Sequence, residues 1–165
     1  MRPAPRMMAF IAVDHDRAIR LRAAGRSDDE FAAFAATGEM IAAHDYRPDE
    51  REDADYAAQL YASVAGLSAS QDPFRLVIAA DVPIARVRDG RSDTDYGAIL
   101  VSGLDWADVT AVFVDDAAAA EAVRSARQAI TAMQDPDLDA ILGLPAVADL
   151  TDDHELLWHT PGEDW

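Results

Sequence analysis

One short run of residues limits the folds open to this chain. Leu76-Val77-Ile78-Ala79-Ala80 is apolar at every position, so both faces of a strand formed by it need to be buried. Asp81-Val82-Pro83 ends the run, because proline cannot donate a hydrogen bond to a sheet ladder. We therefore expect residues 76–80 to form a central strand of a sheet with helices packed on it.

Shorter apolar runs predict the remaining strands. They cover residues 7–13, 31–36, 98–101, 109–114 and, as an edge strand, 156–158. The polar residues 27–30 and 86–95 are expected to form loops. Because the strands at 76–80, 98–101 and 109–114 follow one another without a helix, they suggest hairpin or meander pairing.

Helix signals lie between these runs. Asp14 is a good N-cap for residues 17–24 and Gly25 is a stop signal, while Thr37 can cap a short helix that runs through His44. Another helix is predicted from Pro48 onward. Its expected buried face recurs at intervals of four, four and three and consists of Tyr56, Leu60, Val64 and Leu67.

The clearest helix follows Asp115 or Asp116, either of which can cap it. Its buried face is predicted to consist of Ala119, Val123, Ala126, Ile130 and Met133. Residues 137–150 are expected to form a short helix interrupted near Gly143 and Pro145.

These elements predict one α+β domain with a mixed, mainly antiparallel sheet and packed helices. A length of 165 residues fits a single domain, which we place at residues 7–165. Residues 1–6 contain two prolines and two arginines and precede the first apolar run. We expect them to form a disordered extension.

The charge balance restricts the partners of the chain. Fourteen arginines, no lysine and 31 acidic residues give a net charge of −17. Such a surface repels nucleic-acid phosphates and favours a basic protein partner. The arginines of the first helix are the one patch suited to phosphate, and a solvated helix face is the favoured interpretation of them.

Several functional classes lack their usual residues. The chain has no cysteine, no Gly-x-Ser-x-Gly motif and no glycine-rich phosphate loop, and without lysine it cannot form a Schiff base. The apolar run at residues 7–13 is too short to span a membrane and is followed by no cleavage site for a signal peptide. We therefore expect a cytoplasmic protein with no membrane contact and no cofactor.

Four segments in order resemble an actinobacterial family described as a domain of unknown function. They lie at residues 52–58, at residues 75–83 with the sequence Ala-Ala-Asp-Val-Pro, at residues 112–116 with Val-Asp-Asp, and at residues 153–158 with Asp-His-Glu-Leu-Leu-Trp. Members of that family usually have Tyr after the Trp, where this chain has His159. The resemblance implies an actinobacterial origin, but no activity, ligand or catalytic residue.

The best chemical candidates are Asp81, at the end of the central strand, and His154 with Glu155. Imidazole and carboxylate groups can bind zinc or manganese or transfer protons. The spacing argues against a metal site, because His154 and His159 are five residues apart and the zinc-protease arrangement needs four. A turn cap is the favoured role for Asp81.

Trp158 lies in an acidic tail, with nine acidic residues and no arginine between Asp135 and Trp165. An exposed tryptophan inside a charged rim suits a weak contact with a basic partner. The alternative, which the sequence favours, is that Trp158 packs against the body of the domain.

Two functional hypotheses follow. The first is a non-catalytic interaction or accessory protein, and the absence of catalytic motifs favours it. The second is a small metal-assisted hydrolase that uses Asp81 or the region of His154 and Glu155. The tail residues Glu155 and Trp158 belong to the surface that the first hypothesis requires.

Overall fold

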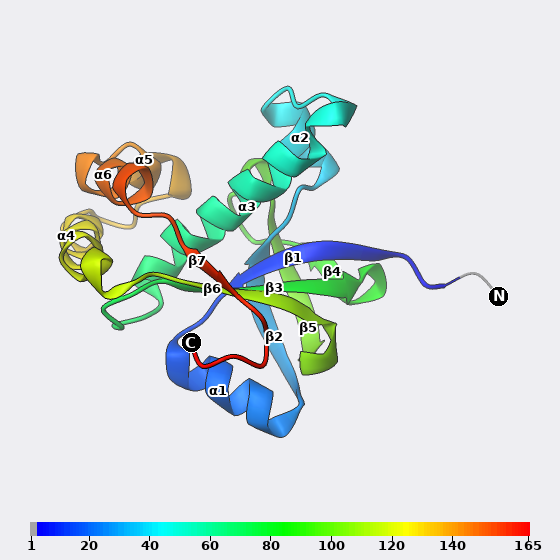
Figure 1. Cartoon of the computed structure of the whole chain (residues 1–165). Helices are drawn as coiled ribbons and strands as arrows, with labels where there is room; N and C mark the ends of the chain where they lie inside the picture. Colours follow the sequence, from blue (N-terminus) through cyan, green and yellow to red (C-terminus); the bar gives the residue numbers. More distant parts are fainter. Residues whose placement is uncertain (1–2) are drawn as a thin grey trace.

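The fold is built on one antiparallel sheet. In the computed structural model, which describes residues 3–165, the strands have the order β4-β5-β2-β1-β3-β6-β7 (Figure 1). The strands are β1 (Arg6–Ala12), β2 (Arg26–Phe34), β3 (Leu76–Pro83), β4 (Val87–Asp89), β5 (Ala98–Asp105), β6 (Val109–Val114) and β7 (Leu157–His159). Within the described residues every pairing of neighbouring strands is antiparallel. The predicted α+β class is confirmed.

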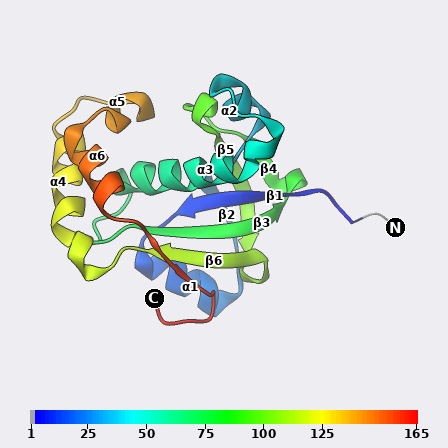
Figure 2. The same cartoon turned by 45° about the horizontal axis from the view of Figure 1, so that its top comes forward.

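Helices cover both faces of this sheet. The α-helices of the described chain are α1 (His15–Ala24), α2 (Gly38–Ala43), α3 (Arg51–Ala65), α4 (Ala120–Thr131), α5 (Leu138–Leu142) and α6 (Pro145–Asp153). One face carries α1, whereas α3 crosses the other face with α4, α5 and α6 beside one end of it (Figure 2). The central strand β3 is therefore buried on both sides, as its unbroken apolar run predicts.

Alternate residues of β3 serve the two layers. Ile78 is fully buried in the apolar cluster that contains Leu21 of α1. Val77 is fully buried in the cluster that contains Val123 and Ile130 of α4. This alternation follows from the period of two along a strand. Val123, Ala126 and Ile130 confirm the predicted inner face of α4, whereas Met133 lies beyond the end of the helix and is half-buried.

Local signals set several helix ends as expected. The Asp14 side chain accepts a hydrogen bond from the Arg17 N–H at 2.7 Å, and Gly25 ends α1 with a φ of 81° in the left-handed region. Thr37 caps α2 by accepting from the Met40 N–H at 3.1 Å. These contacts are formed within a few residues of chain, which is why the sequence predicts them well.

The pairing of the strands differs from the sequence prediction in two ways. The loop expected at residues 27–30 is part of β2, which pairs with β5 around a bulge between Ser27 and Glu30. The loop expected at residues 86–95 contains the edge strand β4. Strand pairing uses backbone hydrogen bonds, which form whether the side chains are polar or apolar. Polar residues that face solvent can therefore belong to a strand, and a search for apolar runs does not find them.

The predicted meander of the strands at 76–80, 98–101 and 109–114 is wrong. In the sheet β5 is separated from β3 by β2 and β1, and β3 pairs with β6 instead. The two strands β5 and β6 therefore lie in different halves of the sheet.

The buried face of α3 agrees with the prediction at Val64 and Leu67, which are fully buried, and differs from it at Tyr56. Ala54, Ala58 and Ala62 are buried against the sheet, whereas Tyr56 is 55% exposed. Small side chains allow close approach, and Gly66 just beyond the helix leaves no room for a Cβ beside Ala12 of β1. The helix is therefore rotated relative to the pattern of large residues, and Tyr56 faces solvent.

The first strand begins one residue earlier than the apolar run predicts. Arg6 is the first residue of β1, pairs with Pro83 and lies 3.0 Å from the Asp108 carboxylate. Residues 1 and 2 of the predicted disordered extension lie outside the described residues.

A buried ion pair connects elements from both halves of the chain. Arg75 and Asp115 form two parallel hydrogen bonds of 2.8 Å, and their side chains are 4% and 0% exposed. Asp115 also accepts from the Arg75 main-chain N–H at 2.9 Å. Arg75 further donates to the His154 carbonyl at 2.8 Å and to the Ser63 hydroxyl at 3.3 Å. Asp116, rather than Asp115, caps the next helical segment by accepting from the Ala118 N–H.

We predict that the adjacent carboxylates Asp115 and Asp116 differ sharply in their contribution to stability. Asp115→Asn leaves a buried guanidinium without its counter-charge and should lower the free energy of unfolding by about 3–5 kcal/mol. Asp116→Ala removes one exposed cap and should cost about 1 kcal/mol. Urea denaturation of the two variants measures both values, and equal losses would contradict this account.

Candidate interaction surface

Trp158 is exposed, contrary to the interpretation that the sequence favours. Its side chain is 59% exposed, although its backbone is paired with Phe113 of β6. Because β7 is the outermost strand of the sheet, its side chains have a neighbouring strand on one side only. Leu157 of the same strand is also exposed, to 47%.

A groove of about 460 Å³ lies between α3 and the strands β1, β3, β6 and β7. We call it the α3–β7 groove. Its sheet side is formed by Met8, Phe10, Ala79, Thr110, Ala111, Phe113 and Trp158, and its helix side by Glu52, Asp55, Tyr56 and Gln59. The groove is thus largely apolar on the sheet side and carries two carboxylates on the helix side.

Two exposed aromatic side chains belong to this groove. Tyr56 comes from α3 and Trp158 from β7, and they are 55% and 59% exposed. Large aromatic residues with a polar atom are typical of protein interfaces, because they bury much area and can still form a hydrogen bond. The rotation of α3 on its alanine face is what brings Tyr56 to the groove.

Asp55 lacks a hydrogen-bond donor. Among residues 3–165 its buried Oδ1 atom has no hydrogen-bond partner, and the nearest cation, Arg51 Nε, is 3.8 Å away. Burial raises the pKa of Asp55; Arg51 opposes this shift and the Glu52 charge adds to it. A donor supplied from outside the chain would satisfy this oxygen.

Glu155 lies on the other side of Tyr56. A narrow cleft is lined by Tyr56 and Gln59 of α3 together with His154, Glu155 and Leu156. Tyr56 and Gln59 line both this cleft and the α3–β7 groove. The structure therefore brings Glu155 and Trp158 to neighbouring parts of one surface.

The other proposed site residues are not brought together. His154 ends α6 and contributes its carbonyl oxygen to Arg75, which precedes β3. Asp81 lies six residues after Arg75 along the chain, which at 3.3 Å per residue places it about 20 Å from Arg75. There its backbone pairs with Met8 of β1. Nowhere in residues 3–165 do three or more histidine, aspartate or glutamate side chains form a group suited to a metal ion.

His159 is engaged within the tail. Its Nδ1 atom lies 3.1 Å from a carboxylate oxygen of Glu163. This hydrogen bond lowers the pKa of Glu163. The imidazole thus belongs to a local contact and lies on the opposite face of β7 from Trp158.

Sequence reasoning missed Tyr56 and Asp55 as members of this surface. The available signal was the series Ala54, Ala58 and Ala62, which has helical spacing and marks a narrow buried face. A pattern search weighted toward large apolar residues places Tyr56 inside instead.

These features define a class of protein: a single-domain α+β protein with helices on both faces of an antiparallel sheet and an aromatic groove beside one edge strand. The chain belongs to a family of unknown function, DUF6912, whose sequence model matches residues 7–164. No curated protein and no solved structure matches it. None of the helices in residues 3–165 is both long and apolar enough to cross a membrane.

The exposure of Trp158 predicts its fluorescence. With Trp106 and Trp165 replaced by Phe, emission should be red-shifted and readily quenched by acrylamide. Trp158→Ala should then lower the free energy of unfolding by less than about 1 kcal/mol, because the side chain is mostly in water. A blue-shifted, protected emission would contradict the structure.

The raised pKa of Asp55 predicts how Asp55→Asn changes stability with pH. At pH 7 the ionised carboxylate is disfavoured in the folded protein, so the uncharged variant should be more stable, by less than about 1 kcal/mol for a partly exposed group. As pH falls through the raised folded pKa, the wild-type protein protonates preferentially when folded and becomes more stable. The advantage of the variant should therefore shrink and level off below the unfolded pKa of 3.8. Urea denaturation across this range measures the difference.

Proposed function

We propose that this protein is a non-catalytic interaction protein, and that the α3–β7 groove binds a basic segment of a partner protein. The observation that carries the proposal is the combination of two exposed aromatic side chains, Tyr56 and Trp158, with the unsatisfied carboxylate oxygen of Asp55 in one groove. An arginine or lysine of the partner would donate to Asp55. Apolar residues next to it would pack on Phe10 and Phe113.

Charge complementarity supports a basic occupant. Glu52 and Asp55 line the groove, Glu155 lies beyond Tyr56, and the whole chain carries a net charge of −17. A field of this sign speeds the approach of cationic partners and disfavours nucleic acids. We propose the cytoplasm as its compartment, because a chain without cysteine fits a reducing environment.

Two synthetic peptides of equal length test the proposed chemistry. One alternates Arg with Leu and the other alternates Glu with Leu, and each is titrated into ¹⁵N-labelled protein. The basic peptide should shift the indole resonance of Trp158 in a saturable way, and salt should weaken the effect. Absence of saturation, or equal shifts with the acidic peptide, would overturn the proposal.

Matched variants locate the binding surface. Leu157→Ala is the control for Trp158→Ala, because both residues are exposed on β7 but their side chains lie on opposite faces of the sheet. Affinity for the basic peptide should fall roughly tenfold or more in Trp158→Ala and stay unchanged in Leu157→Ala, given the usual weight of a central aromatic residue. When the two variants are used to capture proteins from cell lysate, Leu157→Ala should retain the basic proteins that the wild type binds. Trp158→Ala should lose those proteins.

A further inference from the structure

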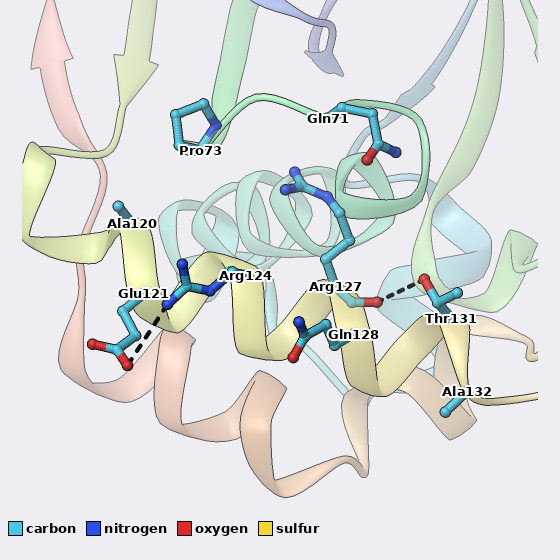
Figure 3. Close-up of a pocket in the computed structure, with 9 residues that line it drawn as sticks. All are labelled: Gln71, Pro73, Ala120, Glu121, Arg124, Arg127, Gln128, Thr131 and Ala132. Carbon is cyan, nitrogen blue, oxygen red and sulfur yellow. Dashed lines mark hydrogen bonds and ion pairs between the residues drawn. The ribbon is translucent and has the colours of Figure 1, made fainter.

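A second hollow lies on the outer side of α4, away from the α3–β7 groove. The loop after residue 68 faces α4 across a cavity of about 790 Å³ (Figure 3). We call it the arginine cavity. Its polar and charged lining residues from α4 include one acid and two arginines. The residues that matter for its chemistry are Gln71 and Pro73 from the loop and Glu121, Arg124, Arg127, Gln128 and Thr131 from α4. Its volume is in the range of small-molecule sites.

Arg127 is held in place but is not neutralised. Its Nε atom donates to the Leu67 carbonyl at 3.0 Å, which fixes the side chain across the cavity with its guanidinium group toward Gln71 (Figure 3). Among residues 3–165 its two terminal nitrogens have no hydrogen-bond partner. The nearby Asp72 carboxylate accepts from the His15 main-chain N–H at 2.8 Å instead.

Such an arginine is unusual in this acidic chain. Ten arginines of the described residues lie within ion-pair distance of a carboxylate. Three further arginines in that part of the chain have no carboxylate within that distance: Arg20, Arg22 and Arg127. Arg127 is the member of this group that lines the arginine cavity. Burial lowers the pKa of Arg127, and the charge of Asp72 opposes this shift.

Arg124 adds a second positive charge to the same cavity. It lies three residues before Arg127, so both side chains leave the same side of α4. Its contact with Glu121 is a loose one of 3.8 Å between exposed groups. Arg124 is therefore available to a ligand at little cost.

The cavity continues past Arg127. A hollow of about 370 Å³ shares Gln71, Arg127 and Thr131 with it. The guanidinium group thus lies between two spaces, with amide groups of Gln71 and Gln128 nearby and the apolar surfaces of Pro73, Ala120 and Ala132 around them.

We infer that the arginine cavity binds a small organic anion. Its carboxylate or phosphate oxygens would accept hydrogen bonds from Arg127 and Arg124, since arginine is suited to paired hydrogen bonds with both groups. The apolar part of the ligand packs on Pro73 and the alanines. No residue of the arginine cavity belongs to the α3–β7 groove, so a negative result for one site leaves the proposal for the other unchanged.

Phenyl phosphate, benzoate and inorganic phosphate are the probes for this site. Each is titrated by isothermal calorimetry and by ¹⁵N spectra at constant ionic strength, with chloride as the reference anion. Phenyl phosphate or benzoate should bind saturably and shift amides of residues 71 and 124–131. The stronger of the two identifies the preferred oxyanion. Binding of inorganic phosphate alone would overturn the assignment to an organic ligand, and no saturable binding of any probe would overturn the site.

Two variants and one control complete the test. Arg127→Gln should weaken binding of the stronger probe tenfold or more. Gln71→Glu places a negative charge opposite Arg127 without removing the contact between Arg127 and Leu67, and it should weaken binding as well. Arg20→Gln removes one exposed positive charge on α1 and should leave the affinity unchanged. Equal affinity in Arg127→Gln and wild type, or equal losses in all three variants, would show that the probes respond to net charge rather than to this cavity.

Discussion

The buried pair of Arg75 and Asp115 joins three segments that lie far apart along the chain. Asp115 follows β6, Arg75 precedes β3, and the carbonyl that Arg75 binds belongs to His154 at the end of α6. Two buried charges are tolerated here because their hydrogen bonds satisfy both. The same contact fixes where the chain leaves α6, and so directs β7 and Trp158 to the edge of the sheet. The proposed interaction surface depends on this ion pair although Arg75 and Asp115 do not line the α3–β7 groove.

The layer of helices α3–α6 creates two surfaces of different character. The buried alanines of α3 let this helix lie close to the sheet. Tyr56 on its other side therefore faces the groove that also contains Asp55 and Trp158. At the other end, α4 presents Arg124 and Arg127 to a cavity that the loop around Gln71 borders. One surface suits a cation and the other an anion. A net charge of −17 therefore does not describe every part of the molecule.

Much of the fold could be predicted from short stretches of sequence. Asp14, Gly25 and Thr37 set helix ends through contacts with residues at most four positions away. The apolar run at β3 and the inner face of α4 follow from the periods of two and 3.6 residues. Three of the segments singled out in the sequence are also physically connected, because Arg75, Asp115 and His154 come from different ones among them.

The sequence by itself determined which segments form helices and central strands, that one α+β domain results, and that the chain is strongly acidic. Tertiary structure alone decided that Trp158 is exposed, that Asp115 binds Arg75 rather than a helix terminus, and that Arg127 faces a cavity. The physical reason is the distance along the chain. Caps and periodicity depend on neighbouring residues, whereas the exposure of Trp158 and the pairing of Asp115 with Arg75 depend on residues 40 or more positions away.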